Sequence, residues 1–289
     1  MALKTLTVTD EAAGLRLDAF LRQYMPELPV PELRASFLRR DVKVNGIRMQ
    51  ASDRVSSGDR IDVYFVSKAA SEPLRIVYED ADVMLVNKHP GISVEADTGS
   101  GITLTELCTR HVLKDDPQAF PPKACHRLDN KTSGLCLFAK NNMAAEILED
   151  VFRRHSLQKE YVCLVRGVPK PPAAKCRAYL VKDASAARVC IYVRPLPGGK
   201  TIITSYQTLS SGTVSRLIVR PLTGRTHQIR AHLAALGHPL LGDDVYGDRA
   251  FNREMKAHTL KLCAFRLTLD TRGRLPQLDG RTFEITPPF

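Results

Sequence analysis

The pattern of hydrophobic and polar positions differs between the first 66 residues and the rest of the chain. Residues 15–24, and a second segment that starts near Pro31, repeat apolar side chains at helical spacing. Asn45-Gly46 between alternating apolar residues predicts a tight hairpin, and residues 61–65 alternate as a strand. We therefore expect a small N-terminal α/β domain over residues 1–66 and a short polar linker over 67–73.

From residue 74 onward, short apolar runs typical of strands outnumber helical repeats. The proline-rich stretch 169–200 reads as a loop-rich insertion around short strands. Because strands and helices do not alternate regularly, we expect an α+β domain over 74–289 with a mixed, mainly antiparallel sheet. Strands are predicted over 74–78, 83–86, 135–139, 161–165, 202–209, 215–219, 264–269 and 282–285, and helices over 103–113, 143–152 and 226–236.

Charge and cysteine usage narrow the class of protein. Lys and Arg number 42 against 31 Asp and Glu, a net charge of +11, which favours a polyanionic partner such as nucleic acid. The seven cysteines are scattered without a Cys-x-x-Cys pair, which is typical of buried thiols in a reducing compartment. No signal-peptide pattern and no apolar run long enough for a membrane span is visible, so we expect a cytoplasmic protein.

The predicted N-terminal domain carries many basic side chains at its helix end and hairpin tips. A solvated charged face would explain them, but their clustering favours contacts to phosphates. The residues of this basic set are Arg34, Arg39, Arg40, Lys43, Arg48, Arg54 and Arg60.

The densest polar motif of the chain covers residues 126–135, directly before an apolar run that predicts a buried strand. Its single carboxylate, Asp129, stands between Arg127 and Lys131, and the nearby positive charge should keep it ionised. A salt-bridged loop aspartate is one interpretation. The other is a positioned carboxylate that acts as a nucleophile, base or charge stabiliser.

Two further motifs combine polar density with a structural frame. Tyr161 begins a strand within residues 158–161, and residues 223–233 lead from a glycine turn into a helix. Arg225 at the helix start could bind a phosphate, and Arg230 could pair with a carboxylate. The spacings of five and six among His227, His232 and His238 do not fit ligands on one helix face, so we expect hydrogen bonding and packing rather than a metal site.

These motifs together resemble the RluA-type family of RNA pseudouridine synthases. The resemblance rests on His126-Arg127-Leu128-Asp129 with Thr132-Ser133-Gly134-Leu135, on Lys159-x-Tyr161, on residues 224–232, on Gly-His-Pro-Leu-x-Gly-Asp-x-x-Tyr-Gly over 237–247, and on Val86-Asn87-Lys88. The basic N-terminal domain resembles the S-four-like RNA-binding domain often fused to these enzymes. The resemblance of the other motifs to the synthases implies that the second domain has the pseudouridine synthase fold.

The resemblance implies isomerisation of uridine in RNA without a cofactor. Asp129 would be the nucleophile or act through elimination, Arg230 would hold it, and Tyr161 would stack on the uracil and relay a proton. The target base would be flipped out of its helix, and Arg127 would fill the gap or bind a phosphate. The residues expected to contact RNA are Arg127, Arg225, His126, Thr132, Arg34, Arg39, Arg40, Lys43 and Arg48.

Several alternatives stay open at this point. Ribosomal RNA is the expected substrate, because an appended domain suits a large structured RNA, and a tRNA is the alternative. A catalytically silent RNA-binding protein and a hydrolase with a pair of carboxylates are rival functions, although the motif around Asp129 offers one carboxylate and no adjacent partner. We expect a monomer that acts on RNA and binds neither DNA nor a membrane.

Overall fold

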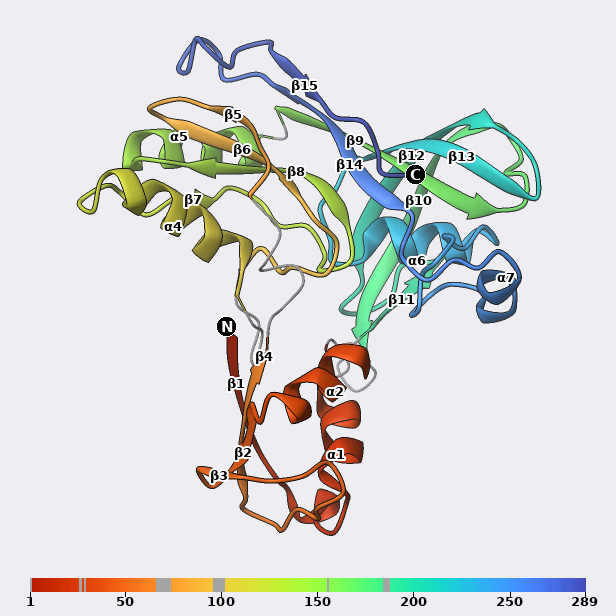
Figure 1. Ribbon diagram of the computed structural model, residues 1–289. Helices are drawn as coiled ribbons and strands as arrows, with labels where there is room; N and C mark the ends of the chain where they lie inside the picture. Colours follow the sequence, from red (N-terminus) through yellow and green to blue (C-terminus); the bar gives the residue numbers. More distant parts are fainter. Residues whose placement is uncertain are drawn as a thin grey trace. The chain divides into compact units, whose positions relative to one another are not determined.

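A computed structural model describes residues 2–25, 28, 30–65, 74–95, 102–154, 156–183 and 188–289 (Figure 1). The chain forms two compact units. The N-terminal unit comprises Met1–Leu74 and Gly91–Pro117, and the sheet unit comprises Arg75–Pro90 and Gln118–Phe289. The expected N-terminal domain over 1–66 is therefore joined by residues 91–117, which we had placed in the second domain. The expected linker over 67–73 lies outside the described residues.

The N-terminal unit contains a four-stranded sheet in the order β1-β4-β2-β3, formed by β1 (Ala2–Thr7), β2 (Val42–Val44), β3 (Ile47–Arg48) and β4 (Arg60–Phe65). Its helices are α1 (Leu17–Tyr24), α2 (Val30–Leu38) and α4 (Leu104–Asp115), with a short 3-10 turn η1 (Asp10–Ala12). Helix α1 buries its apolar face against the sheet, with Leu17, Phe20 and Leu21 in the core. A capping box of Thr103 and Glu106 fixes the start of α4.

The sheet unit is built on eleven strands among its described residues, in the order β11-β10-β12-β13-β9-β14-β8-β6-β5, with β15 beside β14 and β7 beside β8. Helices α5 (Asn142–Arg153), α6 (Gln228–Ala235) and α7 (Arg249–Glu254) accompany it. The strands are β5 (Ile76–Glu79), β6 (Val83–Lys88), β7 (Lys123–Ala124), β8 (Ser133–Ala139), β9 (Leu157–Arg166), β10 (Ala173–Asp183), β11 (Arg188–Tyr192), β12 (Lys200–Ser210), β13 (Val214–Pro221), β14 (Leu262–Leu269) and β15 (Thr282–Glu284).

The strand pairing confirms the expected fold class, because β14 and β8 run parallel and the other described pairs of this sheet are antiparallel. Gly134 at the start of β8 lies in the left-handed region, with φ of +117°. A Cβ there would stand 2.3 Å from the carbonyl oxygen of Ala264 on β14, so only glycine permits this close approach. Gly134 therefore lets the loop of residues 126–133 enter β8 in close contact with the neighbouring strand β14.

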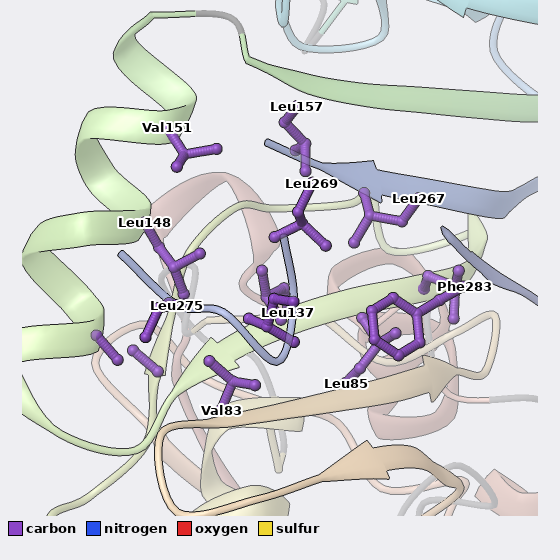
Figure 2. Packing of buried hydrophobic residues seen from close by; sticks show 14 residues of the cluster. Val83, Leu85, Leu137, Leu148, Val151, Leu157, Leu267, Leu269, Leu275 and Phe283 are labelled. Atoms are coloured by element: carbon purple, nitrogen blue, oxygen red, sulfur yellow. The ribbon is translucent and has the colours of Figure 1, made fainter. Parts of the chain in front are cut away.

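One side of β8 packs in the main hydrophobic core of the sheet unit (Figure 2). Helix α5 contributes Leu148 and Val151, and β8 contributes Leu137. The side chain of Asn141 accepts a hydrogen bond from Ala144 N at 2.8 Å and caps the start of α5. Since β8 is buried along its whole length, the loop before it rests on a rigid support.

The proline-rich stretch differs from the loop-rich insertion predicted for residues 169–200. It contains β10, a strand of eleven residues, and the five-residue strand β11. Prolines 169, 171 and 172 precede β10, and prolines 195 and 197 follow β11, so they bound the hairpin without interrupting it. Alternating burial of Ala178 and Leu180 marks the face of β10 that packs in a core with Ala231 of α6. No helix in the described part of the chain is long and apolar enough to cross a membrane.

Candidate active site

Asp129 lies in the loop that leads into β8, and backbone contacts fix this loop. The amide of Thr132 donates to the carbonyl of Asp129 at 3.0 Å and closes a turn. The buried ammonium of Lys88, at the end of β6, donates to the carbonyl of Asn130 at 2.9 Å and to that of His89 at 3.0 Å. Burial lowers the pKa of Lys88 to about 7, although the nearby Cys136 and Asp129 oppose this shift.

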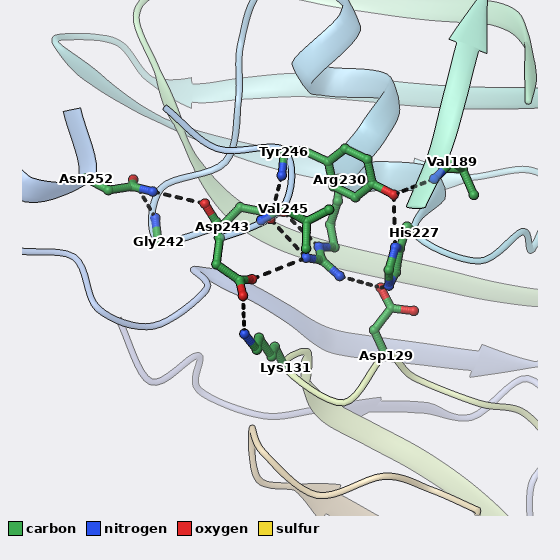
Figure 3. Close-up of polar contacts among 11 residues, drawn as sticks. Asp129, Lys131, Val189, His227, Arg230, Gly242, Asp243, Val245, Tyr246 and Asn252 are labelled. Carbon is green, nitrogen blue, oxygen red and sulfur yellow. Dashed lines mark hydrogen bonds and ion pairs between the residues drawn. The ribbon is translucent and has the colours of Figure 1, made fainter. Parts of the chain in front are cut away.

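Arg230 of α6 faces the carboxylate of Asp129 (Figure 3). Its Nη1 lies 3.6 Å from Asp129 Oδ2, and its side chain is 4% exposed. The expected pairing of these two residues is thus present as an ion pair at longer range. The stronger partner of Arg230 is Asp243, whose Oδ2 and Oδ1 accept from Nε at 2.7 Å and from Nη2 at 2.9 Å.

Asp243 anchors Arg230 from a fully buried position. The amides of Val245 and Tyr246 donate to Oδ1 of Asp243 at 2.8 and 3.0 Å. Burial on its own raises the pKa of Asp243, but the hydrogen bonds and charge of Arg230 outweigh burial and lower it. A Cβ on the preceding Gly242 would stand 1.9 Å from the carbonyl oxygen of Thr259, so this tight segment requires glycine.

His227 is a second neighbour of the Asp129 carboxylate. It precedes α6 in the left-handed conformation, with φ of 53°, and its Nε2 lies 3.9 Å from Asp129 Oδ2. Its Nδ1 lies 3.0 Å from the hydroxyl of Tyr246, which also accepts from Val189 N at 2.9 Å. The Tyr246 ring in turn lies beneath the guanidinium of Arg230, at 5.4 Å. Asp129, His227, Arg230 and Tyr246 therefore form one connected group.

Tyr161 lies on β9, where it pairs with Val219 of β13 and Ala264 of β14. Its side chain is buried. Burial, followed by the negative charge of Asp129, raises the pKa of Tyr161 above its ordinary value of 10. The hydroxyl is therefore protonated at neutral pH, so Tyr161 offers a ring face and a hydrogen-bond donor, not a phenolate base.

The neighbours of Asp129 in sequence are not all its neighbours in space. Lys131, which we expected to help hold Asp129 ionised, forms its ion pair with Asp244. Arg230, 101 positions later in the chain than Asp129, lies beside the carboxylate. The ion pairs that the described residues form with the Asp129 carboxylate therefore come from residues distant in the sequence.

His126 and Thr132 point into the protein, which corrects their expected place on the RNA-binding surface. His126 Nε2 accepts from Leu137 N at 3.2 Å, its ring stacks on Phe152 at 5.3 Å, and its Nδ1 is shielded from solvent. Burial, helped by the charge of Lys159, lowers the pKa of His126 to about 3. Thr132 is 2% exposed, with its hydroxyl shielded. Both residues support the loop.

The other cations expected to contact RNA are exposed or half-buried. Arg127 and Arg225 are exposed in the sheet unit, and the backbone amide of Arg225 donates to Gln228 Oε1 at 3.2 Å. In the N-terminal unit, Arg39 is exposed but paired with Asp41, and Lys43 lies over the ring of Tyr64. Arg34, Arg40 and Arg48 are exposed.

The histidines that we excluded as a metal site make separate contacts. His232 Nδ1 lies 2.9 Å from the hydroxyl of Thr204, and His238 Nδ1 lies 3.1 Å from the carbonyl oxygen of Arg166. Among the residues that the structure describes, no group of three or more His, Cys, Asp or Glu side chains is placed to hold a metal ion.

Three residues of the site escaped the reasoning from residue chemistry: Lys88, Asp243 and Tyr246. Each stands in a segment that supported the family resemblance, but none has a pattern that reveals its role. Asp243 is followed by Asp244, and only the fold shows which carboxylate is buried. The position of Asp243 directly after Gly242, in a segment too tight for a Cβ, was the available sign that its side chain is buried.

Solved structures with a similar fold define the class of this protein. Human RNA pseudouridylate synthase domain containing 1 is 28% identical, with a TM-score of 0.60, over 78% of this chain and 86% of that one. Human RNA pseudouridylate synthase domain containing 4 is 25% identical, with a TM-score of 0.61, over 74% and 88%. The fold is thus that of the pseudouridylate synthase class of enzymes.

The sequence comparisons extend this class to a family. The family profile described as RNA pseudouridylate synthase matches residues 82–235, and the chain belongs to that family. It is 32% identical to ribosomal large subunit pseudouridine synthase C of Escherichia coli K12, over 88% of this chain and 83% of that protein. It is 35% identical to an uncharacterized RNA pseudouridine synthase of Chlorobaculum parvum, over 84% and 78%. The expected enzyme class, an isomerase acting on RNA, is confirmed.

Proposed function

We propose that this enzyme converts uridine to pseudouridine in ribosomal RNA and that Asp129 is its reacting carboxylate. The observation that carries the proposal is the arrangement of Asp129 and Arg230, in which a buried guanidinium, itself fixed by Asp243, faces Oδ2 of a loop carboxylate. An arginine fixed in this way presents a preorganised positive charge that orients the carboxylate before the substrate arrives.

The other residues of the site have complementary roles in this proposal. Asp129 attacks the sugar carbon that carries the base, or starts an elimination, while the bond from ribose to the uracil nitrogen breaks and the uracil leaves with its electron pair. The uracil rotates and bonds to the sugar through carbon, which releases Asp129, and Arg230 holds the carboxylate in either route. Tyr161, protonated because of its raised pKa, stacks on the uracil and relays a proton through its hydroxyl. The exposed Arg127 fills the space left by the flipped base or binds a phosphate, and Arg225 binds a phosphate.

Ribosomal RNA is proposed as the substrate because a relative that the chain matches over 88% of its length is named a ribosomal large subunit pseudouridine synthase. The N-terminal unit is proposed to be an S-four-like RNA-binding domain, since it presents exposed arginines on helix α2 and on the β2–β3 hairpin. We further propose a cytoplasmic monomer that needs no cofactor.

The test of the catalytic proposal is Asp129→Asn, which keeps the shape of the side chain and removes its charge. We expect isomerisation of uridine in RNA to be lost while RNA binding is retained. Total RNA from cells that lack the enzyme is incubated with the wild-type enzyme or with Asp129→Asn, and the pseudouridine formed is measured. Unchanged turnover by Asp129→Asn would refute the mechanism, and release of free uracil would indicate a hydrolase.

The substrate proposal is tested with the same RNA, separated into ribosomal and transfer fractions before incubation. We expect new pseudouridine in the large ribosomal RNA. New pseudouridine in the transfer fraction alone would replace ribosomal RNA by tRNA as the substrate and leave the role of Asp129 intact.

A further inference from the structure

His227 lies between two oxygen atoms of the site. Its Nε2 is 3.9 Å from Asp129 Oδ2, and its Nδ1 is 3.0 Å from the hydroxyl of Tyr246. Figure 3 shows the ring bridging the two residues. A neutral imidazole carries one proton, on Nδ1 or on Nε2, and the two forms present opposite hydrogen-bonding groups to Asp129.

Tyr246 decides which nitrogen carries the proton. Its hydroxyl oxygen already accepts a hydrogen bond from Val189 N at 2.9 Å. The hydroxyl proton therefore needs an acceptor, and the described neighbour that can supply one is His227 Nδ1. If Nδ1 carried the proton instead, the lone pair of Nε2 would face the carboxylate of Asp129, which is repulsive. Both arguments place the proton on Nε2.

The two oxygen atoms of Asp129 then have different surroundings. Oδ2 faces two donors, Nη1 of Arg230 at 3.6 Å and Nε2 of His227 at 3.9 Å. No hydrogen bond or ion pair from the described residues reaches Oδ1. Both distances exceed those of hydrogen bonds, and such contacts of catalytic groups often shorten when a substrate binds.

We propose that His227 is a positioning residue whose Nε2–H, fixed by Tyr246, joins Arg230 in holding Oδ2 of Asp129, so that Oδ1 is the oxygen that reacts with the substrate. This inference rests on the proposed role of Asp129 and holds for either reaction route. It gives His227 a role in orienting the carboxylate without contact to the substrate.

The electrostatics around His227 support a neutral ring. Burial lowers the pKa of His227, and the charge of Arg230 adds to this effect. The carboxylates of Asp129, Asp243 and Asp244 oppose it but do not reverse the direction. A neutral ring has a tautomer to fix, which is the function assigned here to Tyr246.

Two substitutions of His227 separate its two nitrogen atoms. Asn places an amide near the position of Nδ1, tolerates the left-handed conformation and lacks a donor at Nε2. Gln reaches the position of Nε2 and restores a donor toward Asp129. We expect His227→Asn to lower kcat by about 10- to 100-fold, as for loss of a hydrogen bond to a charged group, with little change in KM. His227→Gln should recover kcat to within about 5-fold of the wild type, since the restored bond is of the same kind.

A spectroscopic measurement tests the tautomer without relying on activity. Nitrogen-15 NMR of the imidazole groups should show His227 as the neutral Nε2–H form in the wild type, with its signal assigned by its absence in His227→Gln. Tyr246→Phe removes one of the two groups that favour Nε2–H and leaves Asp129 in place, so the Nδ1–H share of the His227 signal should rise relative to the wild type. An Nδ1–H or doubly protonated ring in the wild type would overturn the proposal.

The kinetic test has a matched control, and its outcomes distinguish failure of the positioning role from failure of the proposed function. His258→Asn, at an exposed position outside the site, should leave kcat unchanged. Full kcat in His227→Asn, or equal losses in the Asn and Gln variants, would overturn the positioning role. Retained activity in Asp129→Asn would instead refute the proposed function, whereas the NMR measurement would still report the tautomer of His227.

Discussion

Arg230 in the sheet unit and Arg40 in the N-terminal unit show two opposite uses of an arginine. The guanidinium of Arg230 is 4% exposed and forms a two-bond fork with the fully buried Asp243. Arg40 follows helix α2 in a left-handed conformation, with an exposed side chain that has no ion pair to any described residue. The first charge is committed within the protein, and the second is available to a partner.

This difference separates catalysis from RNA binding in physical terms. A buried cation that already donates two hydrogen bonds cannot bind a phosphate without breaking them. Arg230 and Lys88 therefore serve groups of the chain itself. An exposed cation contributes little to folding but gains free energy by releasing counterions from RNA. Substitutions in the first set should act on stability and kcat, and those in the second on RNA affinity.

The largest effect is expected for Asp243→Asn. This change removes the buried counter-charge that is hydrogen-bonded to the guanidinium of Arg230, which should cost about 3–5 kcal/mol in the free energy of unfolding. Because Arg230 loses its orientation toward Asp129, kcat should fall by about 100-fold. Urea unfolding and turnover assays measure the two quantities.

Asp244→Asn is the matched control for that experiment. Asp244 is 53% exposed and pairs with Lys131 and, at 3.7 Å, with Nη2 of Arg230. Because solvent screens these exposed pairs, its substitution should change stability by less than about 1 kcal/mol. Similar losses in the two variants would contradict the distinction between a committed and an exposed charge at adjacent positions.

A smaller effect, on the pH dependence of stability, is expected at Lys88. Its pKa is about 7 in the folded protein and near 10.4 in an unfolded chain, so the unfolded state holds one more proton between these values. The free energy of unfolding should therefore rise with pH in this window, by up to about 1.4 kcal/mol per unit, and the penalty of burial is fully present below pH 7.

Lys88→Met removes this proton and should flatten the rise between pH 7 and 9 relative to the wild type. Lys123→Met, at an exposed position of β7, serves as the control and should keep the wild-type slope. Equal slopes for Lys88→Met and the wild type would show that Lys88 is protonated in the folded protein throughout this range.

The sequence predicted the framework of both units well, because periodicity reports burial locally. The helix over 143–152, the 83–86 strand and the hairpin at Asn45 follow from apolar spacing and turn chemistry, and the structure confirms them. The length of strand β10 differs from the short strands predicted for this stretch, because its prolines flank the strand and do not interrupt it. Strand β1 was missed because its described side chains are exposed or half-buried, which leaves a weak pattern.

The site was predictable as a set of motifs but not as a geometry. Asp129, Tyr161 and Arg230 were chosen from the sequence, yet the anchor of Arg230 depends on which of two adjacent aspartates is buried. The roles of His126 and Thr132 depend on the direction in which a loop side chain points. The burial of one aspartate and the direction of a loop side chain leave no periodic pattern in the sequence, because both arise from contacts between distant segments.

The exposed cations of the N-terminal unit should act on RNA affinity alone. Replacing Arg34, Arg40 and Arg48 together by Ala should weaken RNA binding by about 10-fold at low salt and make its salt dependence shallower by about 0.7–0.9 per lost phosphate contact. Filter binding over a salt series measures both. An unchanged slope would show that these side chains form only a solvated surface.

The smallest effect separates two neighbouring arginines of the same unit. Arg39 pairs with Asp41 at 2.7 Å, whereas Arg40 has no described ion pair. If a free charge is what RNA uses, Arg40→Ala should reduce the salt slope of binding by about 0.7–0.9, and Arg39→Ala should reduce it less because Asp41 already offsets that charge. Arg39→Ala should instead cost up to about 1 kcal/mol of stability, the range of an exposed ion pair. A larger loss of RNA affinity for Arg39→Ala than for Arg40→Ala would mean that RNA displaces Asp41, and that an existing ion pair does not exclude an exposed arginine from binding.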